Sequence, residues 1–175
     1  MKRLILWLPL IVLIAFVATV AFRLYGGKDD IVRSQMIGKP VPEFALEAAV
    51  KSHPALRVQD LRTGEPRLLN IFASWCAPCA IESPQLRELQ RRGIPIDAVA
   101  IRDRPEDVAA FLQRYGDSFA RIGSDPATQF QFALGSSGVP ETFVIDGKGI
   151  IRHQHVGYIG PEDLDEITAA YEAAK

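Results

Sequence analysis

The stretch that decides the fold is residues 67–79, RLLNIFASWCAPC. Its first seven residues, Arg67 to Ala73, are mostly apolar and predict a buried strand. Cys76 and Cys79 follow within a few residues, and the chain has no other cysteines. We expect a helix from about Ala77 to about Arg91. The sequence therefore predicts a strand that runs straight into a helix, with both cysteines at the junction.

The spacing of the two cysteines is compatible with three kinds of site. A zinc site needs four ligands, and only His53, His153 and His155 could complete one. A structural disulfide across so short a loop would restrain the unfolded chain by only about 2 kcal/mol, against nearly 5 for a 100-residue loop. Redox chemistry is therefore the favoured interpretation of Cys76 and Cys79.

The position of the cysteines at a helix start supports that chemistry. Unpaired amides and the helix dipole stabilise a thiolate at the first cysteine, so we predict that Cys76 is the nucleophile. Its attack on a partner disulfide gives a mixed disulfide, which a thiol one helical turn further on can release. We predict that Cys79 is this second thiol.

Outward from this stretch, strand-like and helix-like runs alternate from Ile37 to the end, which is typical of an α/β fold. Pro84 should kink the first helix, and Asp103 is predicted to cap the next one. The segment 47–59 is compatible with either a strand or a loop. Further strands are expected at 94–101, 119–122, 142–145 and 150–156, and helices after Asp103, at 125–134 and after Pro161.

The N-terminal region differs from the rest in composition. Leu4 to Phe22 is a run of nineteen uncharged, mostly apolar residues between basic flanks. As a helix it would be roughly 28 Å long, close to the thickness of bilayer hydrocarbon. A cleaved secretory signal is the alternative, but 19–21 (Thr-Val-Ala) is a mediocre cleavage site. We expect a cytoplasmic N-terminus (1–3), a transmembrane anchor (4–23), a linker (24–36) and a single domain (37–175).

The charge balance excludes one class of partner. The 175-residue chain has a net charge of -1, and beyond residue 27 it carries 17 basic against 21 acidic residues. A nucleic-acid-binding protein would need a concentrated basic face, so no nucleic-acid partner is expected. We expect a monomer with one hydrophobic core.

Several motifs taken together resemble the thioredoxin superfamily. A Trp-Cys-x-Pro-Cys motif is followed by a proline five residues later, and a Val-Pro-Glu-Thr-Phe motif precedes a hairpin. More narrowly, the chain resembles the DsbE/CcmG family of thiol:disulfide interchange proteins of cytochrome c maturation, over about residues 37–175. The matching pieces are 38–44 (GKPVPEF), 68–76 (LLNIFASWC), 138–146 (GVPETFVID) and 149–152 (GIIR).

This resemblance implies a fold, a location and partners. The fold would be thioredoxin-like, a central mixed β-sheet flanked by helices, with a single-pass anchor in the bacterial inner membrane and a periplasmic domain. The substrate would be apocytochrome c, whose haem-attachment cysteines the protein keeps reduced. Electrons would come from an integral-membrane thiol transporter of the DsbD/CcdA kind. The redox-active disulfide would be the only prosthetic chemistry, with no metal and no other cofactor.

The resemblance also assigns site residues. Pro140 matches the cis-proline that faces the active-site disulfide, and Glu82 and Glu141 match acids that tune thiol reactivity and proton transfer. For Glu82, a solvated helix residue is the alternative. Asn70 stands where thioredoxin has a buried, proton-handling aspartate, and an amide cannot take that role. Trp75 is predicted to be partly core and partly a lid over the disulfide.

Other functions stay open at this point. The same chemistry could serve a general periplasmic reductase or an assembly factor for copper sites. A non-catalytic module that binds apocytochrome belongs to a different class. A peroxidase is disfavoured because its reactive cysteine usually lies in a different sequence setting.

Overall fold

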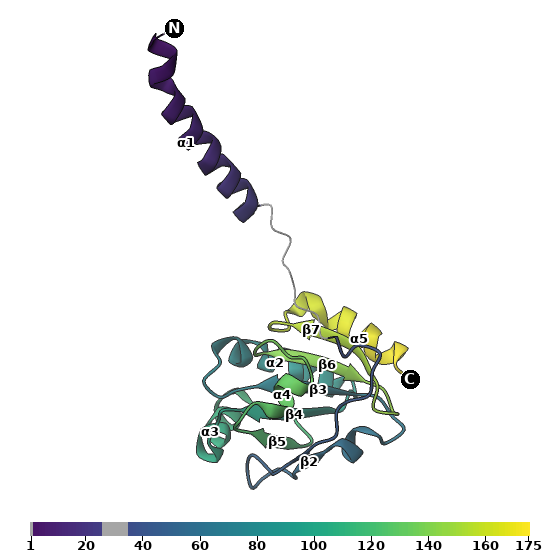
Figure 1. Ribbon diagram of the computed structural model, residues 1–175. Helices are drawn as coiled ribbons and strands as arrows, with labels where there is room; N and C mark the ends of the chain where they lie inside the picture. Colours follow the sequence, from purple (N-terminus) through teal and green to yellow (C-terminus); the bar gives the residue numbers. More distant parts are fainter. Residues whose placement is uncertain (1, 26–34) are drawn as a thin grey trace. The chain divides into compact units, whose positions relative to one another are not determined.

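The computed structural model describes residues 2–25 and 35–175, which belong to two separate compact units (Figure 1). The first unit contains one helix, α1 (Lys2–Tyr25). Among the described residues, no helix meets both the length and the apolarity required to cross a bilayer. The anchor predicted at 4–23 is therefore not confirmed and stays a prediction, and most of the linker predicted at 24–36 lies outside the described residues.

The second unit is built on a five-stranded sheet in the order β5-β4-β3-β6-β7. β3, β4 and β5 are parallel, whereas β6 and β7 run antiparallel to their neighbours. This arrangement confirms the predicted central mixed sheet and puts β3, the strand before the cysteines, in the middle. The strand bounds are Arg67–Phe72 (β3), Ile96–Ile101 (β4), Ile122–Asp125 (β5), Glu141–Ile145 (β6) and Ile151–Val156 (β7).

The helices that follow β3 and β4 pack on one face of the sheet. Because β3, β4 and β5 are parallel and follow one another in one direction, right-handed crossovers put α2 and α3 on the same face. α2 also contacts α5. The helix bounds are Ala77–Arg91 (α2), Pro105–Tyr115 (α3), Gln129–Ala133 (α4) and Leu164–Ala173 (α5), with short 3-10 turns at Val58–Leu61 (η1) and Pro161–Asp163 (η2).

The segment 47–59 forms structure at one edge of the sheet. It contributes β2 (Leu56–Arg57), which pairs with β1 (Ala45–Leu46). Just after β1, the amide of Ala49 donates to the carbonyl of Ile122 at 2.8 Å, so this part of the chain runs along β5. An edge strand covered in this way is protected from pairing with other chains.

β3 and β4 form the centre of the core, although they also carry the polar residues Arg67, Asn70 and Asp97. Every residue of both strands is buried, as expected for central parallel strands covered on both faces. Phe72 at the end of β3 packs against Phe111 and Phe119, with ring centroids 5.5 and 5.2 Å apart. The end of β3 is thus firmly packed immediately before the cysteine motif.

Two predicted elements differ from the structure. The strand predicted at 119–122 exists as β5 but is displaced along the chain: it begins at Ile122, and the buried ring of Phe119 packs on Phe72 from the preceding loop. The helix predicted at 125–134 is shorter, since α4 starts only at Gln129. Its N-cap, Thr128, has a left-handed backbone with φ 58°, which ends the turn that precedes the helix.

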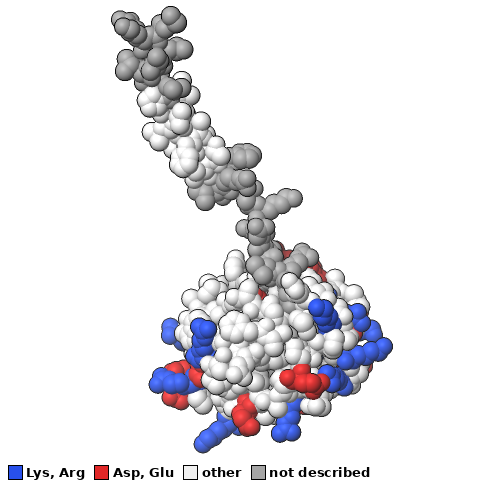
Figure 2. Space-filling view, in the orientation of Figure 1, with Lys and Arg blue, Asp and Glu red and all other residues white. Residues whose placement is uncertain are grey.

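Charged side chains on the surface occur mainly as mixed, paired groups. On the face shown in Figure 2, Lys and Arg lie near Asp and Glu around the rim of the domain, and the middle of that face is uncharged. Arg62 contacts Glu43 at 2.8 Å, and Arg104 contacts Asp107 at 2.7 Å. Exposed pairs of this kind contribute little to stability, so the domain depends on its core.

The turn that joins β6 and β7 contains a close approach between two loops. The Asp146 carboxylate accepts hydrogen bonds from the amides of Lys148 and Ile150, both at 2.9 Å. A Cβ placed on Gly147 would lie 2.2 Å from the carbonyl carbon and oxygen of Gly64. Only glycine fits here without moving one of the two backbones.

We therefore expect Gly147→Ala to lower the free energy of unfolding by about 2 kcal/mol, because overpacked sites cost about that much. Gly138→Ala is the matched control, since a Cβ there meets nothing within 4 Å. Urea denaturation of both variants measures the difference. Equal stability of the two variants would contradict the close approach.

Candidate active site

The two cysteines lie at the junction of β3 and α2, as predicted. Cys76 is the N-cap residue of α2, and its sulfur accepts a hydrogen bond from the backbone amide of Cys79 at 3.2 Å. The two residues form a disulfide with their Cα atoms 5.3 Å apart. Cys76 is 5% exposed and Cys79 only 2%. When the bond is reduced, the amide aimed at the Cys76 sulfur stabilises a thiolate there rather than on Cys79.

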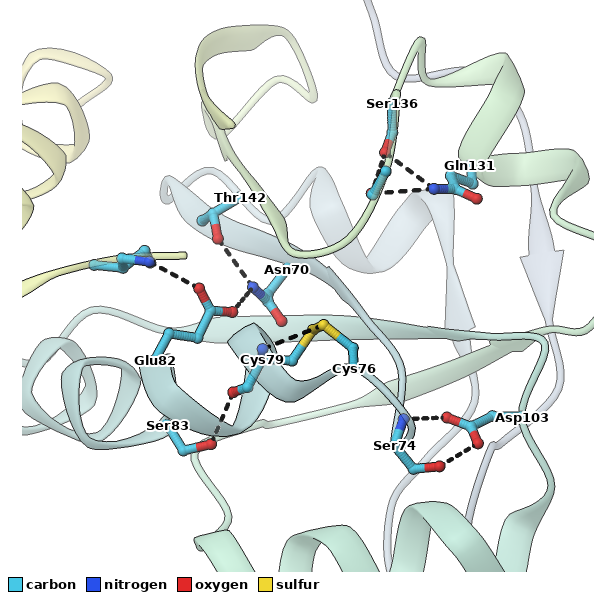
Figure 3. Close-up of a disulfide and its surroundings, with 12 residues drawn as sticks. Asn70, Ser74, Cys76, Cys79, Glu82, Ser83, Asp103, Gln131, Ser136 and Thr142 are labelled. Atoms are coloured by element: carbon cyan, nitrogen blue, oxygen red, sulfur yellow. Dashed lines mark hydrogen bonds between the residues drawn. A yellow bond between two sulfur atoms is a disulfide. The ribbon is translucent and has the colours of Figure 1, made fainter. Parts of the chain in front are cut away.

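Glu82 is buried beside this pair and belongs to a hydrogen-bonded group of three side chains (Figure 3). Asn70 donates from Nδ2 to Glu82 Oε1 and to Thr142 Oγ1, both at 2.9 Å. The amide of Ile159 donates to Glu82 Oε2 at 3.0 Å. The group around Glu82 thus brings together residues from β3, α2, β6 and the segment before η2. The interpretation of Glu82 as a solvated helix residue is therefore wrong.

Burial raises the pKa of Glu82 from 4.5 to about 7. The hydrogen bonds from Ile159 and Asn70 favour the charged form and oppose this rise, but desolvation outweighs them. A carboxyl group with this pKa exchanges its proton near neutral pH. Asn70 cannot do so, and within the described residues its Oδ1 is a buried acceptor without a hydrogen-bond partner.

The Val139-Pro140 peptide bond is cis, as the resemblance implied. Glu141 follows it and is 1% exposed. Its Oε1 accepts from the amide and the hydroxyl of Ser137, at 2.8 and 2.6 Å, and Oε2 accepts from Gln154 at 3.1 Å. The Glu141 carboxylate therefore holds the loop that leads into the cis-proline.

The structure does not bring the two predicted acids together. Glu141 and Thr142 are successive residues of β6, so their side chains point to opposite faces of the sheet. Because Thr142 contacts Asn70 in the group around Glu82, Glu141 faces away from that group. A direct effect of Glu141 on the thiols stays a prediction, whereas its contacts with the loop are observed.

Trp75 lies on the surface rather than in the core. Its side chain is 58% exposed, and its indole Nε1 donates to the carbonyl of Arg102 at 3.3 Å. A groove of about 600 Å³ opens beside it, between the end of β4 and α3. Its lining includes Arg102, Arg114 and the ion pair of Arg104 with Asp107.

Asp103 is a site residue whose contacts differ from the sequence prediction. It was predicted to cap α3, but the N-cap is Arg104 and no side chain caps that helix. The Asp103 carboxylate instead accepts from the amide of Ser74 at 2.6 Å and from the Ser74 hydroxyl. The sequence contained a signal for this contact. Ser74 lies two residues after β3 and Asp103 two residues after β4, and parallel neighbouring strands end at the same edge of a sheet.

The histidines considered as metal ligands contact carboxylates instead. His153 Nε2 lies 3.6 Å from Glu166, and His155 Nε2 lies 3.7 Å from Asp163. In the part of the chain that the structure describes, no group of three or more His, Cys, Asp or Glu side chains is placed to hold a metal ion.

Comparisons with known proteins agree with this geometry. The Redoxin family model matches residues 36–171. The thiol:disulfide interchange protein HelX of Rhodobacter capsulatus is 37% identical over 168 residues, which cover 96% of this chain and 93% of HelX. The thiol:disulfide interchange protein DsbE of Escherichia coli K12 is 35% identical over 170 residues, covering 95% of this chain and 92% of DsbE.

A solved structure shows the same fold. A Chlorobium tepidum protein described as a DsbE-type thiol:disulfide interchange protein is 30% identical, with a TM-score of 0.65 over 79% of this chain and 96% of its own. A buried cysteine pair at the start of a helix, with a backbone amide donating to the first sulfur, is suited to thiol–disulfide exchange. The chain therefore belongs to the Redoxin family, among the DsbE and HelX thiol:disulfide interchange proteins, and is a thiol–disulfide oxidoreductase.

Proposed function

We propose that this protein is a periplasmic reductase that reduces the disulfide between the haem-attachment cysteines of apocytochrome c during cytochrome c maturation. The observation that carries the reaction is the buried Cys76–Cys79 disulfide at the start of α2, with the Cys79 amide directed at the Cys76 sulfur. The choice of substrate is supported by the motifs shared with the DsbE/CcmG family and by the similarity to DsbE and HelX.

The reaction proceeds in two exchange steps. The Cys76 thiolate attacks one sulfur of the substrate disulfide, which forms a mixed disulfide and releases one substrate thiolate. Cys79 then loses its proton and attacks Cys76, which releases the second substrate thiol and closes the Cys76–Cys79 bond. Two electrons pass to the substrate. An integral-membrane thiol transporter of the DsbD/CcdA kind restores the reduced pair.

In the second step, Glu82 accepts the proton of Cys79. Cys79 and Glu82 are three residues apart in α2, so their side chains are neighbours on one helical face. A pKa of about 7 lets Glu82 take and return a proton at neutral pH. The residue Cys79 is buried, so bulk water has poor access to it.

Substrate chain is proposed to bind at the surface around Cys76. Glu141 holds the loop that contains the cis-proline Pro140. An extended substrate segment can pair with the backbone of this loop. The groove beside Trp75 offers space for residues that flank the reacting cysteine. Neither surface requires a second copy of the chain, and we propose that the protein acts as a monomer.

We also propose that residues 4–23 anchor the protein in the inner membrane, with residues 1–3 in the cytoplasm and the domain in the periplasm. The support is the run of nineteen uncharged residues, together with exposed apolar side chains along α1 such as Ile11, Ile14 and Phe16. Protease added to spheroplasts should digest the domain, and carbonate washing should leave the protein with the membranes. Release by carbonate would contradict the anchor.

Deletion of the gene in its own host tests the choice of substrate. We expect mature c-type cytochromes, measured by haem staining and absorbance, to be lost and to return with the wild-type chain but not with Cys76→Ser. An added low-molecular-weight thiol should restore them without any protein. Normal cytochromes in the deletion strain would favour a general reductase or a copper-site assembly factor instead. Full complementation by a Cys76→Ser, Cys79→Ser chain would establish a non-catalytic binding module.

A further inference from the structure

The turn that presents Cys76 is fixed by residues from another strand. Inside the turn, the amide of Cys76 donates to the carbonyl of Ala73 at 3.2 Å. From outside, the Asp103 carboxylate accepts from both the amide and the hydroxyl of Ser74 (Figure 3). The carbonyl of Arg102 accepts from the Trp75 indole. Arg102 and Asp103, which follow β4, thus hold Trp75 and Ser74, which precede Cys76.

The conformation of the β4–α3 segment is itself unusual. Arg102 has φ 49°, in the left-handed region that residues other than glycine rarely adopt. This backbone leaves the Arg102 carbonyl in contact with Trp75 and the Asp103 carboxylate in contact with Ser74. Strained backbone beside an active site persists where the surrounding contacts require it.

We propose that Asp103 is a positioning residue that sets the acidity of the Cys76 thiol by holding Ser74. The Cys76 thiolate is stabilised through the amide of Cys79, and this contact depends on where the turn places the Cys76 side chain relative to the first turn of α2. Asp103 reaches the sulfur only through Ser74. The proposal concerns thiol chemistry alone and holds whichever disulfide the protein reduces.

The direction of the effect separates positioning from simple charge. If Asp103 acted only as a nearby negative charge, its removal would lower the pKa of the Cys76 thiol, because a negative charge disfavours a thiolate. If Asp103 positions the turn, its removal weakens the contact between the Cys79 amide and the Cys76 sulfur and raises that pKa. The two mechanisms therefore predict opposite shifts.

The test uses the full chain in detergent with Cys79→Ala, which leaves Cys76 as the only thiol and keeps the amide of residue 79. The pH dependence of thiolate absorbance and of iodoacetamide alkylation gives the pKa of Cys76. We expect Asp103→Ala to raise it by about one unit, a tenfold smaller thiolate fraction below the pKa. Ser74→Ala, which keeps the charge and the backbone bond, should raise it by less, and Ser74→Thr should keep the original value.

Asp107→Ala is the matched control, because Asp107 lines the same groove but pairs with Arg104 and not with the turn. It should leave the pKa of Cys76 unchanged. A lowered or unchanged pKa in Asp103→Ala would overturn the proposal. If Asp103→Ala fails to fold, Ser74→Ala alone decides the question. A raised pKa of Cys76 in Ser74→Ala supports positioning by Asp103 through Ser74, and an unchanged pKa overturns it.

Discussion

Cys76→Ser abolishes disulfide reduction, whereas Cys79→Ser gives a protein that reacts once and then stays covalently joined to its partner. The reason is the division of roles at the start of α2. The amide of Cys79 stabilises the Cys76 thiolate, and Cys79, one helical turn further on, acts only after the mixed disulfide has formed. Without Cys79 no thiol is positioned to release the partner.

A peptide with one internal disulfide serves as the substrate in this experiment. Under non-reducing conditions, mass spectrometry should show a peptide adduct of the Cys79→Ser protein and none of the Cys76→Ser protein. The double variant is the control for non-specific capture. An adduct with Cys76→Ser but not with Cys79→Ser would reverse the assignment of nucleophile and resolving thiol.

Glu82→Gln slows release of the mixed disulfide at pH 7 by roughly 100-fold, the lower range for loss of a general base. The glutamine keeps the volume and an acceptor oxygen but cannot carry the proton of Cys79. In the wild-type protein, the rate of release should rise as pH increases through about 7, where Glu82 becomes a base. In Glu82→Gln this inflection should vanish, and the two rates should converge at high pH, where the thiol ionises without help.

Rapid mixing at several pH values, with release of a fluorescent peptide as the signal, measures these rates. Glu106→Gln in α3 is the matched control, because Glu106 is exposed and pairs with Arg104. It should follow the wild-type profile. A Glu82→Gln protein with an unchanged inflection near pH 7 would show that another group handles the proton.

The same residue makes stability depend on pH in a defined direction. The unfolded chain releases the Glu82 proton near pH 4.5, while the folded protein keeps it until about pH 7. Between these values the folded state binds more protons, so the free energy of unfolding falls as pH rises, and it levels off above pH 7. The contribution of protonated Glu82 to the free energy of unfolding is fully present below pH 4.5 and amounts to about 3 kcal/mol. Between pH 4.5 and pH 8, urea denaturation should show a fall in the free energy of unfolding that is larger by about this amount in the wild type than in Glu82→Gln.

The burial of Glu82 is the feature of the site that is least evident from the sequence. The helix from Ala77 to Arg91 was predicted with the bounds the structure has, yet Glu82 within it was open to interpretation as a surface residue. Helical periodicity places residues relative to one another around an axis. Whether a face is covered depends on what packs there, and Glu82 is covered partly by Ile159, which lies 77 residues further along the chain.

The hydrogen bonds of Asp103 also depend on a distant segment of the chain. An acid two residues before a proline is a good local signal for a helix N-cap, and in an isolated segment that interpretation would be reasonable. In the folded domain, β3 and β4 lie side by side and end at the same edge, so the carboxylate meets Ser74, 29 residues away. The tertiary contact satisfies two donors at once, the amide and the hydroxyl of Ser74.

The sequence by itself determined the strand that leads into the cysteine motif, the helix that follows, and the position of Cys76 at its first turn. Those features depend on apolar patterning and helix-start chemistry within about twenty-five residues, so they can be recognised locally. Only the tertiary structure decided that Glu82 is buried against Asn70, that Glu141 faces the opposite side of the sheet, and that Asp103 holds Ser74. Desolvation and hydrogen bonding depend on which distant segments come together, and this is settled by packing of the whole domain.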